Sequence, residues 1–362
     1  VNLLTKLLCS LGFDAQCAGN TRPSLIEAVI RRKKMNKQPD FWVLELSSFQ
    51  LALTNSFSPT YSTVLNFSQD HLDWHRNEID YLESKLKVFG TPFASSQALI
   101  CRDDKNLATK IHEYLDSKRL NKNKKEILTF GCSIPDQTPG FGINSAEKFC
   151  YFDSAKKIKY SEFPLEVSDL KLFGNHNYSN ITFCLTLISQ ITKNYQNSLQ
   201  TLKNHMGEPH RLEKFLSVKN LIFFNDSKST NIGATVTALQ SLKDPVILLL
   251  GGKTKNQRFD ILADSIHSRS INPIIFGKKV SKISRIFEKY CIAYERADDL
   301  KAAVKLTKKT IQKMIKNTER KINILLSPSC SSHDAFKSYE ERGDEFKRLI
   351  ISEFKNEIAN AR

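Results

Sequence analysis

The stretch LIFFNDSKSTN, at positions 221–231, decides the fold of the second half of the chain. Its apolar first residues predict a buried strand, and its polar last residues predict the start of a helix. Helix capping explains Ser229 or Thr230, but it leaves Asp226 and Lys228 unexplained. A helix start presents donors to an anion, and Asp and Lys side chains can bind ribose or phosphate oxygens. The stretch therefore predicts an α/β unit that binds a nucleotide or a phosphate.

The same alternation of apolar runs and helical patterns continues on both sides of this stretch. In the second half, strands are predicted at 221–224, 246–250, 273–276, 291–294 and 322–326. In the first half, strands are predicted at 41–46, 63–67, 98–101 and 127–130, and helices near 2–11, 24–33, 78–89 and 106–117. Residues 131–170 predict a few antiparallel strands, and 177–204 a pair of helices. We therefore expect an α/β protein with two doubly wound domains, each with a largely parallel sheet between helices.

The length of the chain also indicates two domains. Its 362 residues exceed the roughly 250–300 at which single cores stop growing. The Gly and Pro of HMGEP, at 205–209, mark the boundary. The predicted domains are 1–207 and 208–362.

Charge and cysteine content narrow the class of protein. The 54 Lys and Arg exceed the 38 Asp and Glu by 16, which fits either a lysine-rich solvated surface or a basic groove. No aromatic residues interleave the lysines as a stacking platform requires, so we expect no nucleic-acid partner. No apolar run approaches the ~20 residues of a membrane span, and we identify no signal peptide, so we expect no membrane insertion. The eight scattered cysteines indicate buried thiols in a reducing cytoplasm, without disulfides or structural zinc.

Polar residues at the ends of predicted strands are the candidates for chemistry, because ligands of open α/β sheets bind there. Glu45 ends one strand, and a buried carboxylate needs a cation such as Mg²⁺, unless it caps a loop donor. His71 follows the next strand, and together the two residues favour a divalent cation site. His71 and His75 have the spacing of zinc ligands, but the H-E-x-x-H pattern is absent. Lys85 lies on the following helix and by spacing alone would be an exposed lysine.

Two further segments follow predicted strands in the second half. LLLGGKTK, at 248–255, leads from a strand into a glycine-rich turn with lysines, which is a weak pattern alone. LSPSCSSHD, at 326–334, ends the last strand in a cluster of hydroxyls. Cys330 could be a nucleophile, but no His and Asn pair stands in a matching context, so we favour a buried thiol.

Taken together, these segments resemble the Mur ligase family. Nine ordered motifs carry the resemblance: ELSSFQL (45–51), NFSQDHLDWH (66–75), the helix with Lys85, GNHNYSN (174–180), EPHRLE (208–213), NDSKSTN (225–231), LLLGGK (248–253), LSPSCSSHDAF (326–336) and YEERGDEF (339–346). The match is best to the members that add D-glutamate to UDP-N-acetylmuramoyl-L-alanine with ATP and Mg²⁺. The resemblance thus implies a cytoplasmic ATP-dependent acid–amino-acid ligase of peptidoglycan synthesis, which we expect to be a monomer.

The resemblance also implies roles for individual residues. Glu45 and His71 would hold Mg²⁺, and Lys85 would be carbamylated and support a second metal ion. The residues that would contact ATP are Asn20, Asn177, Asn180, Arg211, Asp226 and Lys228. Ser47, Ser48 and Gln50 would lie near the muramoyl-alanine substrate, and Thr230, Lys255, Ser332 and Tyr339 would bind D-glutamate. Tyr339 stands where we expect a phenylalanine, a change that keeps a stacking surface.

The start of the sequence departs from the family. Family members have a P-loop just before the helix that 1–11 resembles, and a preceding uridine-binding domain. The chain begins with Val1, and G-x-x-x-x-G-K-[ST] does not occur in it. We therefore expect the chain as given to be inactive with ATP. The alternatives are another Mur or folylpolyglutamate-type amide ligase, and a truncated remnant that only binds a ligand or a partner.

Overall fold

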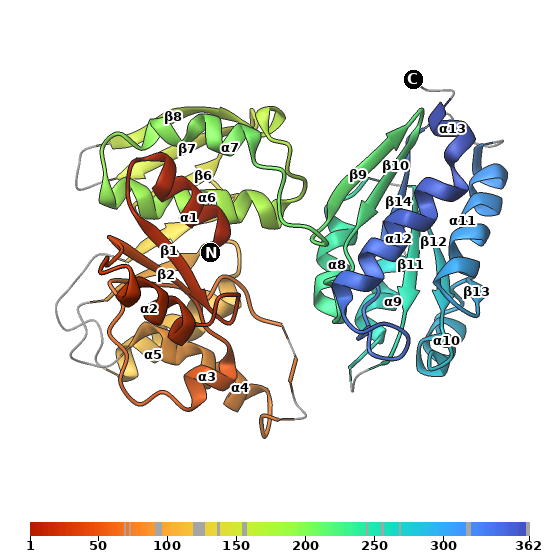
Figure 1. Ribbon diagram of the computed structural model, residues 1–362, viewed down its shortest axis with the longest axis horizontal. Helices are drawn as coiled ribbons and strands as arrows, with labels where there is room; N and C mark the ends of the chain where they lie inside the picture. The colour runs from red at the N-terminus through yellow and green to blue at the C-terminus, as the bar shows by residue number, and fades with distance from the viewer. Residues whose placement is uncertain are drawn as a thin grey trace. The chain divides into compact units, whose positions relative to one another are not determined.

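The chain forms two compact units, Val1–His205 and Met206–Arg362, in a computed structural model (Figure 1). The structure describes residues 1–68, 70–71, 74–90, 96–118, 127–135, 138–153, 158–243, 245–254, 257–267, 269–315 and 320–359. The division lies two residues before the boundary proposed from the sequence. Each unit contains its own sheets and cores, and each is treated separately below.

The first unit contains two sheets. Strands β1 (Ala15–Gly19) and β2 (Phe41–Glu45) form a parallel pair in which Gly19 lies opposite Glu45. The second sheet has six strands in chain order: β3 (Tyr61–Ser62), β4 (Gln97–Cys101), β5 (Leu128–Phe130), β6 (Gly140–Ile143), β7 (Lys148–Asp153) and β8 (Ile158–Glu166). It is parallel from β3 to β6 and antiparallel from β6 to β8, as predicted for 131–170.

Helices cover the sheets of the first unit. They are α1 (Asn2–Ser10), α2 (Leu25–Lys34), α3 (Ser48–Ala52), α4 (Glu78–Leu86), α5 (Lys105–Ser117), α6 (Asn175–Ile191) and α7 (Leu199–Asn204), with short 3-10 helices at Lys87–Phe89, Val167–Asp169 and Tyr195–Ser198. Side chains of α1 and α6 pack with those of β4 to β8 in one hydrophobic cluster. A second cluster joins α4, α5 and the other side of β4, where Ala98 and Ile100 point. Both faces are therefore buried at β4, as in an α/β domain, whereas the antiparallel strand β8 exposes alternate residues such as Glu162, Pro164 and Glu166.

Two expectations for the first unit are wrong in detail. The strand predicted at 63–67 lies earlier and is shorter: it is formed by Tyr61 and Ser62, because only these two residues pair with β4. Val64 beyond it still packs into the core, but Leu65 is exposed, so the apolar run there is only half buried. Strand β1 was not predicted, because its sequence AQCAG lacks the β-branched and aromatic residues that indicate a strand.

The second unit contains one six-stranded sheet in the order β13-β12-β11-β14-β10-β9. The strands are β9 (Glu213–Val218), β10 (Leu221–Asn225), β11 (Val246–Gly251), β12 (Ile271–Phe276), β13 (Glu295–Ala297) and β14 (Ile322–Leu326). All neighbours are parallel except β9, which forms a hairpin with β10. The helices are α8 (Ile232–Gln240), α9 (Asp260–His267), α10 (Ser281–Lys289), α11 (Leu300–Ile315), α12 (Tyr339–Glu353) and α13 (Lys355–Ala359).

The core of the second unit lies on both faces of this sheet. Leu249, Ile324 and their neighbours pack against α11 and α12 in one cluster. Leu250 and Leu325, which point the other way along the same strands, are also fully buried. The predicted doubly wound α/β fold is therefore confirmed.

One predicted strand of the second unit is wrong. Cys291 ends the turn after α10, residues 292–294 form an irregular connection, and the strand β13 begins at Glu295. Cys291 has a φ of +53°, which is compatible with a helix end and not with a strand.

All eight cysteines are free thiols, and no disulfide forms. Four of them are buried, but Cys9 and Cys291 are exposed, so the expectation of buried thiols is only partly confirmed. Within the described ranges, every helix is too short or too polar to cross a bilayer.

Candidate active site

The ends of β1 and β2 bring Asn20 against Glu45. The backbone N–H of Asn20 donates to the Glu45 carbonyl at 2.6 Å, and its side-chain amide donates to the Glu45 carboxylate at 3.3 Å. Gly19, with a φ of +118°, makes this approach possible, because a Cβ there would overlap the Glu45 carbonyl oxygen. Two residues assigned to ATP and Mg²⁺ from the resemblance therefore lie side by side.

Glu45, Asp70 and Lys85 form a group of interacting charges. Burial lowers the pKa of Lys85, and the negative charges of Asp70 and Glu45 oppose that shift. The Lys85 ammonium lies 4.9 Å from the centroid of the Tyr81 ring, on the same face of α4. His71 belongs to this group, since its backbone N–H donates to Asp70 and its ring lies edge-on to Tyr81 at 6.0 Å. The lysine that spacing alone would leave exposed is thus partly buried beside carboxylates.

The chemistry of this group suits a divalent cation bound through oxygen atoms. Carboxylates such as those of Glu45 and Asp70 are ordinary ligands of hard cations, and a carbamate on Lys85 would add two more oxygens. The His71 imidazole would add a nitrogen, which hard cations bind less readily. Within the part of the chain that the structure describes, no cluster of three or more His, Cys, Asp or Glu side chains is already arranged to hold a metal ion. The residues therefore fit Mg²⁺ by their type, and Lys85 would contribute a ligand only after modification.

The start of α3 fixes the residues assigned to the muramoyl substrate. Ser47 is the N-cap and accepts a hydrogen bond from the Gln50 backbone, while the Gln50 side chain accepts one from the Ser47 backbone. This reciprocal cap holds both side chains at the end of β2. Ser48 is buried, and its hydroxyl lies 2.9 Å from Nε2 of His75.

The first turns of α6 carry Asn177 and Asn180, which lie one turn apart on one side of the helix. The Asn177 amide donates to the Phe173 carbonyl at 2.7 Å and so closes the turn before the helix. Gly174 precedes the helix with a φ of +96°. Both asparagines are partly exposed and stay candidates for a nucleotide contact.

In the second unit, Asp226 is the centre of a buried network of polar side chains. It follows β10 directly, is 6% exposed, and accepts hydrogen bonds from the hydroxyls of Ser229 and Ser327 and from the Leu212 backbone. Burial raises the pKa of Asp226 to about 6, although these hydrogen bonds and the charge of Arg211 act against the shift. The carboxylate therefore ties the turn after β10 to the end of β14.

The other predicted residues of this unit lie around that turn. Lys228 places its ammonium 5.3 Å from the centre of the Tyr339 ring. Thr230 is partly exposed, its backbone N–H donating to Lys228, and Arg211 is exposed. Ser332 is buried in the loop after β14. Lys255 lies outside the described residues, so its predicted role stays a prediction.

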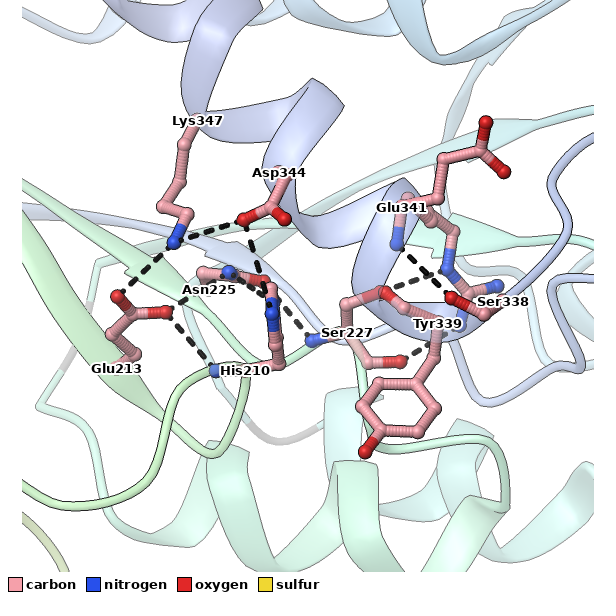
Figure 2. A network of polar contacts seen from close by, with 10 residues as sticks. His210, Glu213, Asn225, Ser227, Ser338, Tyr339, Glu341, Asp344 and Lys347 are labelled. Atoms are coloured by element: carbon pink, nitrogen blue, oxygen red, sulfur yellow. Dashed lines mark hydrogen bonds and ion pairs between the residues drawn. The ribbon is translucent and has the colours of Figure 1, made fainter.

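Arg342 links three of these segments and was not predicted from the sequence. It is fully buried on α12 and donates to the Ser227 hydroxyl, to the Ser227 carbonyl and to the Cys330 carbonyl, at 3.0, 2.8 and 3.1 Å. Ser227 in turn donates to the Tyr339 carbonyl at 2.8 Å (Figure 2). Burial lowers the pKa of Arg342 to about 10, because its acceptors are neutral. The guanidinium thus fixes both strand-end loops to the helix that begins with Tyr339.

A second network holds the turn before β9, as Figure 2 shows. The buried Asn225 amide donates to Nδ1 of His210 and to Glu213, at 2.9 and 3.1 Å. Lys347 on α12 forms ion pairs with both Glu213 and Asp344. Because Arg211 and Leu212 directly follow His210, this network fixes one side of the Asp226 site.

The residues that sequence analysis missed are those that hold others in place. Asp70, Asn225, Ser327 and Arg342 all lie within motifs that resemble the family, but no single motif indicated a role for them. The sequence pattern that could have suggested Asp70 was its position next to His71, just beyond a predicted strand.

Comparison with known proteins identifies the family. The family model for the Mur ligase middle domain matches residues 1–188. The chain belongs to the Mur ligase family. A UDP-N-acetylmuramoylalanine--D-glutamate ligase of Nitrosomonas eutropha is 32% identical over 349 residues, which cover 96% of this chain and 69% of that protein. The ligase of the same name from Nitrosomonas europaea is 31% identical and covers 98% of this chain and 71% of its own length.

Solved structures confirm the fold of this Mur ligase family member. MurF from Acinetobacter baumannii superposes with a TM-score of 0.61 at 13% identity, covering 97% of this chain and 73% of that chain. A folylpolyglutamate synthase of Mycobacterium tuberculosis, solved with ADP and AMPPCP, superposes with a TM-score of 0.65 at 11% identity, over 96% of this chain and 87% of that one.

Proposed function

We propose that this Mur ligase family member joins D-glutamate to UDP-N-acetylmuramoyl-L-alanine in peptidoglycan synthesis, at the expense of ATP. The similarity to ligases of that name across 96% of the chain carries the proposal. The two groups of polar residues, around Glu45 and around Asp226, support it, because both stand at the carboxyl ends of strands. The proposal includes action as a monomer in the cytoplasm.

The reaction needs an activated carboxylate. A carboxylate is a poor electrophile until one of its oxygens becomes a leaving group, so ATP first transfers its γ-phosphoryl group to the alanyl carboxylate. The amine of D-glutamate then attacks the acyl phosphate, and the tetrahedral intermediate expels inorganic phosphate to leave the amide bond. The role of the protein is to position these groups and to stabilise the charge that develops on the phosphoryl oxygens.

The first unit supplies the residues for the phosphoryl transfer. Glu45, His71 and a carbamylated Lys85 would hold Mg²⁺, which neutralises phosphate charge when it is bound. Partial burial favours the neutral amine of Lys85, and only a neutral amine can react with CO₂. Asn20, Asn177 and Asn180 would contact ATP, and Ser47, Ser48 and Gln50 would lie against the muramoyl-alanine substrate.

The second unit supplies the residues for the incoming amino acid. Thr230, Lys255, Ser332 and Tyr339 would bind D-glutamate, while Arg211, Asp226 and Lys228 would contact ATP. Cations and hydroxyls suit a ligand with two carboxylates. The buried Asp226 and Arg342 would keep these groups in place, since they connect the loops that carry them.

The test is an amide ligation assay on the gene product that contains these 362 residues. ATP, Mg²⁺ and UDP-N-acetylmuramoyl-L-alanine are supplied with D-glutamate, L-glutamate, L-alanine or a diamino acid, and the product is identified by mass spectrometry. We expect a product with D-glutamate only. A product with another amino acid, or glutamate addition to a folate, would assign the chain to a different amide ligase.

A further inference from the structure

A histidine, a serine and an aspartate form a connected group in the first unit. His75 is 2% exposed, and its Nε2 lies 2.9 Å from the Ser48 hydroxyl. Its Nδ1 lies 3.6 Å from the Asp80 carboxylate, which is an electrostatic contact but too long for a hydrogen bond. Nδ1 is buried and has no hydrogen-bond partner among the described residues. A buried imidazole with only one hydrogen bond is unusual and calls for an explanation.

Aromatic rings fix the orientation of this imidazole. The Phe49 ring stacks on it with centroids 5.8 Å apart and an angle of 11° between the planes. The Trp74 ring meets it edge-on at 4.5 Å, and the Tyr81 ring lies 5.0 Å away. The ring plane is therefore held, so that one nitrogen faces Ser48 and the other faces Asp80.

The position of Asp80 selects the tautomer. Hydrogen bonds from the Arg76 side chain and backbone lower the pKa of Asp80, so its carboxylate is ionised at neutral pH. A negative charge 3.6 Å from Nδ1 favours a proton on that nitrogen. Nε2 then carries a lone pair, and the hydrogen bond must run from the Ser48 hydroxyl to the imidazole.

This hydrogen bond connects the two segments that carry the charged group. Ser48 lies three residues after Glu45, at the start of α3. The backbone N–H of His75 donates to the His71 carbonyl at 3.0 Å, and that of Trp74 donates to the same oxygen at 3.1 Å. The position of His71 relative to Glu45 is therefore set in part by the contact between His75 and Ser48.

We propose that His75 is a positioning residue. With its proton on Nδ1, facing Asp80, its Nε2 accepts a hydrogen bond from the Ser48 hydroxyl and so holds the Glu45 and His71 segments in register for the phosphoryl transfer. The kinetic consequence rests on the proposed function, but the tautomer does not. The two parts can therefore be tested separately.

The tautomer is measured by two-dimensional ¹⁵N–¹H NMR on the 362-residue protein labelled at histidine. The resonances of His75 are assigned by their loss in His75→Phe, which retains an aromatic ring in the same place. We expect the tautomer with its proton on Nδ1, and a population shifted towards Nε2–H in Asp80→Asn. A ring protonated on Nε2, or on both nitrogens, in the unsubstituted protein would overturn the proposal.

The kinetic part is a double-mutant cycle in the active gene product. Ser48→Ala and His75→Phe should each lower kcat/KM for the muramoyl substrate by about tenfold, the usual size of one lost hydrogen bond to a positioned group. The double variant should be no worse than either single variant, and the KM for D-glutamate should change by less than about twofold. Multiplied losses in the double variant would show that the two residues act independently, which would overturn the positioning role.

The control is His112→Phe, on the exposed side of α5, which should leave kinetics and the His75 resonances unchanged. If the gene product makes no amide with D-glutamate, the proposed function fails. The NMR result still decides the tautomer in that case.

Discussion

The guanidinium of Arg342 holds Ser227 by both its hydroxyl and its carbonyl oxygen, at 3.0 and 2.8 Å. Ser227 lies between Asp226 and Lys228 in the turn after β10, and Arg342 lies one turn into α12, 115 residues later. A positive charge buried against neutral acceptors is costly, and the three hydrogen bonds offset only part of the desolvation, because the pKa of Arg342 is still lowered to about 10. The turn is thereby fixed to the helix.

The first prediction concerns the stability of the second unit. Arg342→Met removes three donated hydrogen bonds, two of them to backbone carbonyl oxygens, which should destabilise that unit by about 2–4 kcal/mol. Both tryptophans, Trp42 and Trp74, belong to the first unit, so their fluorescence follows its unfolding in urea, while far-UV circular dichroism follows both units. We expect the circular dichroism transition to move and the fluorescence transition to stay. Arg348→Met, on the exposed side of α12, is the control and should cost less than about 1 kcal/mol; equal effects would contradict the role of Arg342.

The second prediction concerns Gly343. Replacing a glycine inside a helix by alanine normally stabilises by about 1 kcal/mol. At Gly343 a Cβ would overlap Nδ1 of His210 and lie 2.9 Å from Oδ1 of Asn225. We therefore expect Gly343→Ala to destabilise by about 1–3 kcal/mol in urea unfolding. In a His210→Ala background, Gly343→Ala should cost less stability than it does in the unsubstituted protein, because the overlapping imidazole is absent. Strictly additive effects of the two substitutions would refute the predicted overlap.

The third prediction is a pH dependence of stability due to Asp226. Its pKa is raised from 3.8 to about 6 in the folded protein, so the folded state binds the proton more tightly than the unfolded state. The stability due to this group is therefore greatest below pH 4 and falls as the pH rises to about 6, by about 3 kcal/mol in total. Asp226→Asn cannot ionise, so its stability relative to the unsubstituted protein should increase by that amount between pH 4 and 7. A difference that does not change with pH would show that Asp226 keeps an ordinary pKa.

The fourth prediction concerns Lys85. In the active gene product, Lys85→Ala should lose most of its ligase activity, and short carboxylic acids should restore part of it by replacing the carbamate oxygens. Incubation with ¹³C-bicarbonate should also give a carbamate resonance that is absent from Lys85→Ala. Lys110→Ala, on the exposed side of α5, serves as the matched control and should behave as the unsubstituted protein. Full activity of Lys85→Ala would show that Lys85 is an ordinary helical lysine with no role in the reaction.

The fifth prediction separates the two substrates of the second step. Thr230→Val keeps the shape of the side chain but removes its hydroxyl, so the KM for D-glutamate should rise about tenfold. Formation of the acyl phosphate should change little, and it is measured as ADP release in the absence of D-glutamate. Equal losses in both steps would mean that Thr230 belongs to the nucleotide site.

The sequence by itself determined the alternation of strands and helices, and with it the two α/β units. The run 246–250 is apolar at every position, and 322–326 is apolar at every position except Asn323. Only a strand covered on both faces buries runs of this kind, and every residue of both is buried. It also placed Glu45 and Asp226 at strand ends, because an apolar run that stops at a polar residue marks the edge of a sheet. His71, which the sequence placed just after the next strand, lies nine residues beyond Ser62, where β3 ends. The short strand β1, with its small residues, and the shift from 291–294 to β13 could not be predicted, because neighbouring strands decide which residues pair.

Only the tertiary structure decided what each polar residue contacts. Spacing alone would leave Lys85 exposed, and the fold buries it in part beside Asp70 and Glu45. Arg342 looks like any helical arginine, and the fold encloses it between two strand-end loops. Ser48 and His75 lie 27 residues apart, and no local pattern relates them. Helix and strand patterns depend on neighbours in sequence, whereas the pKa and the role of a side chain depend on charges and donors that distant segments bring to it.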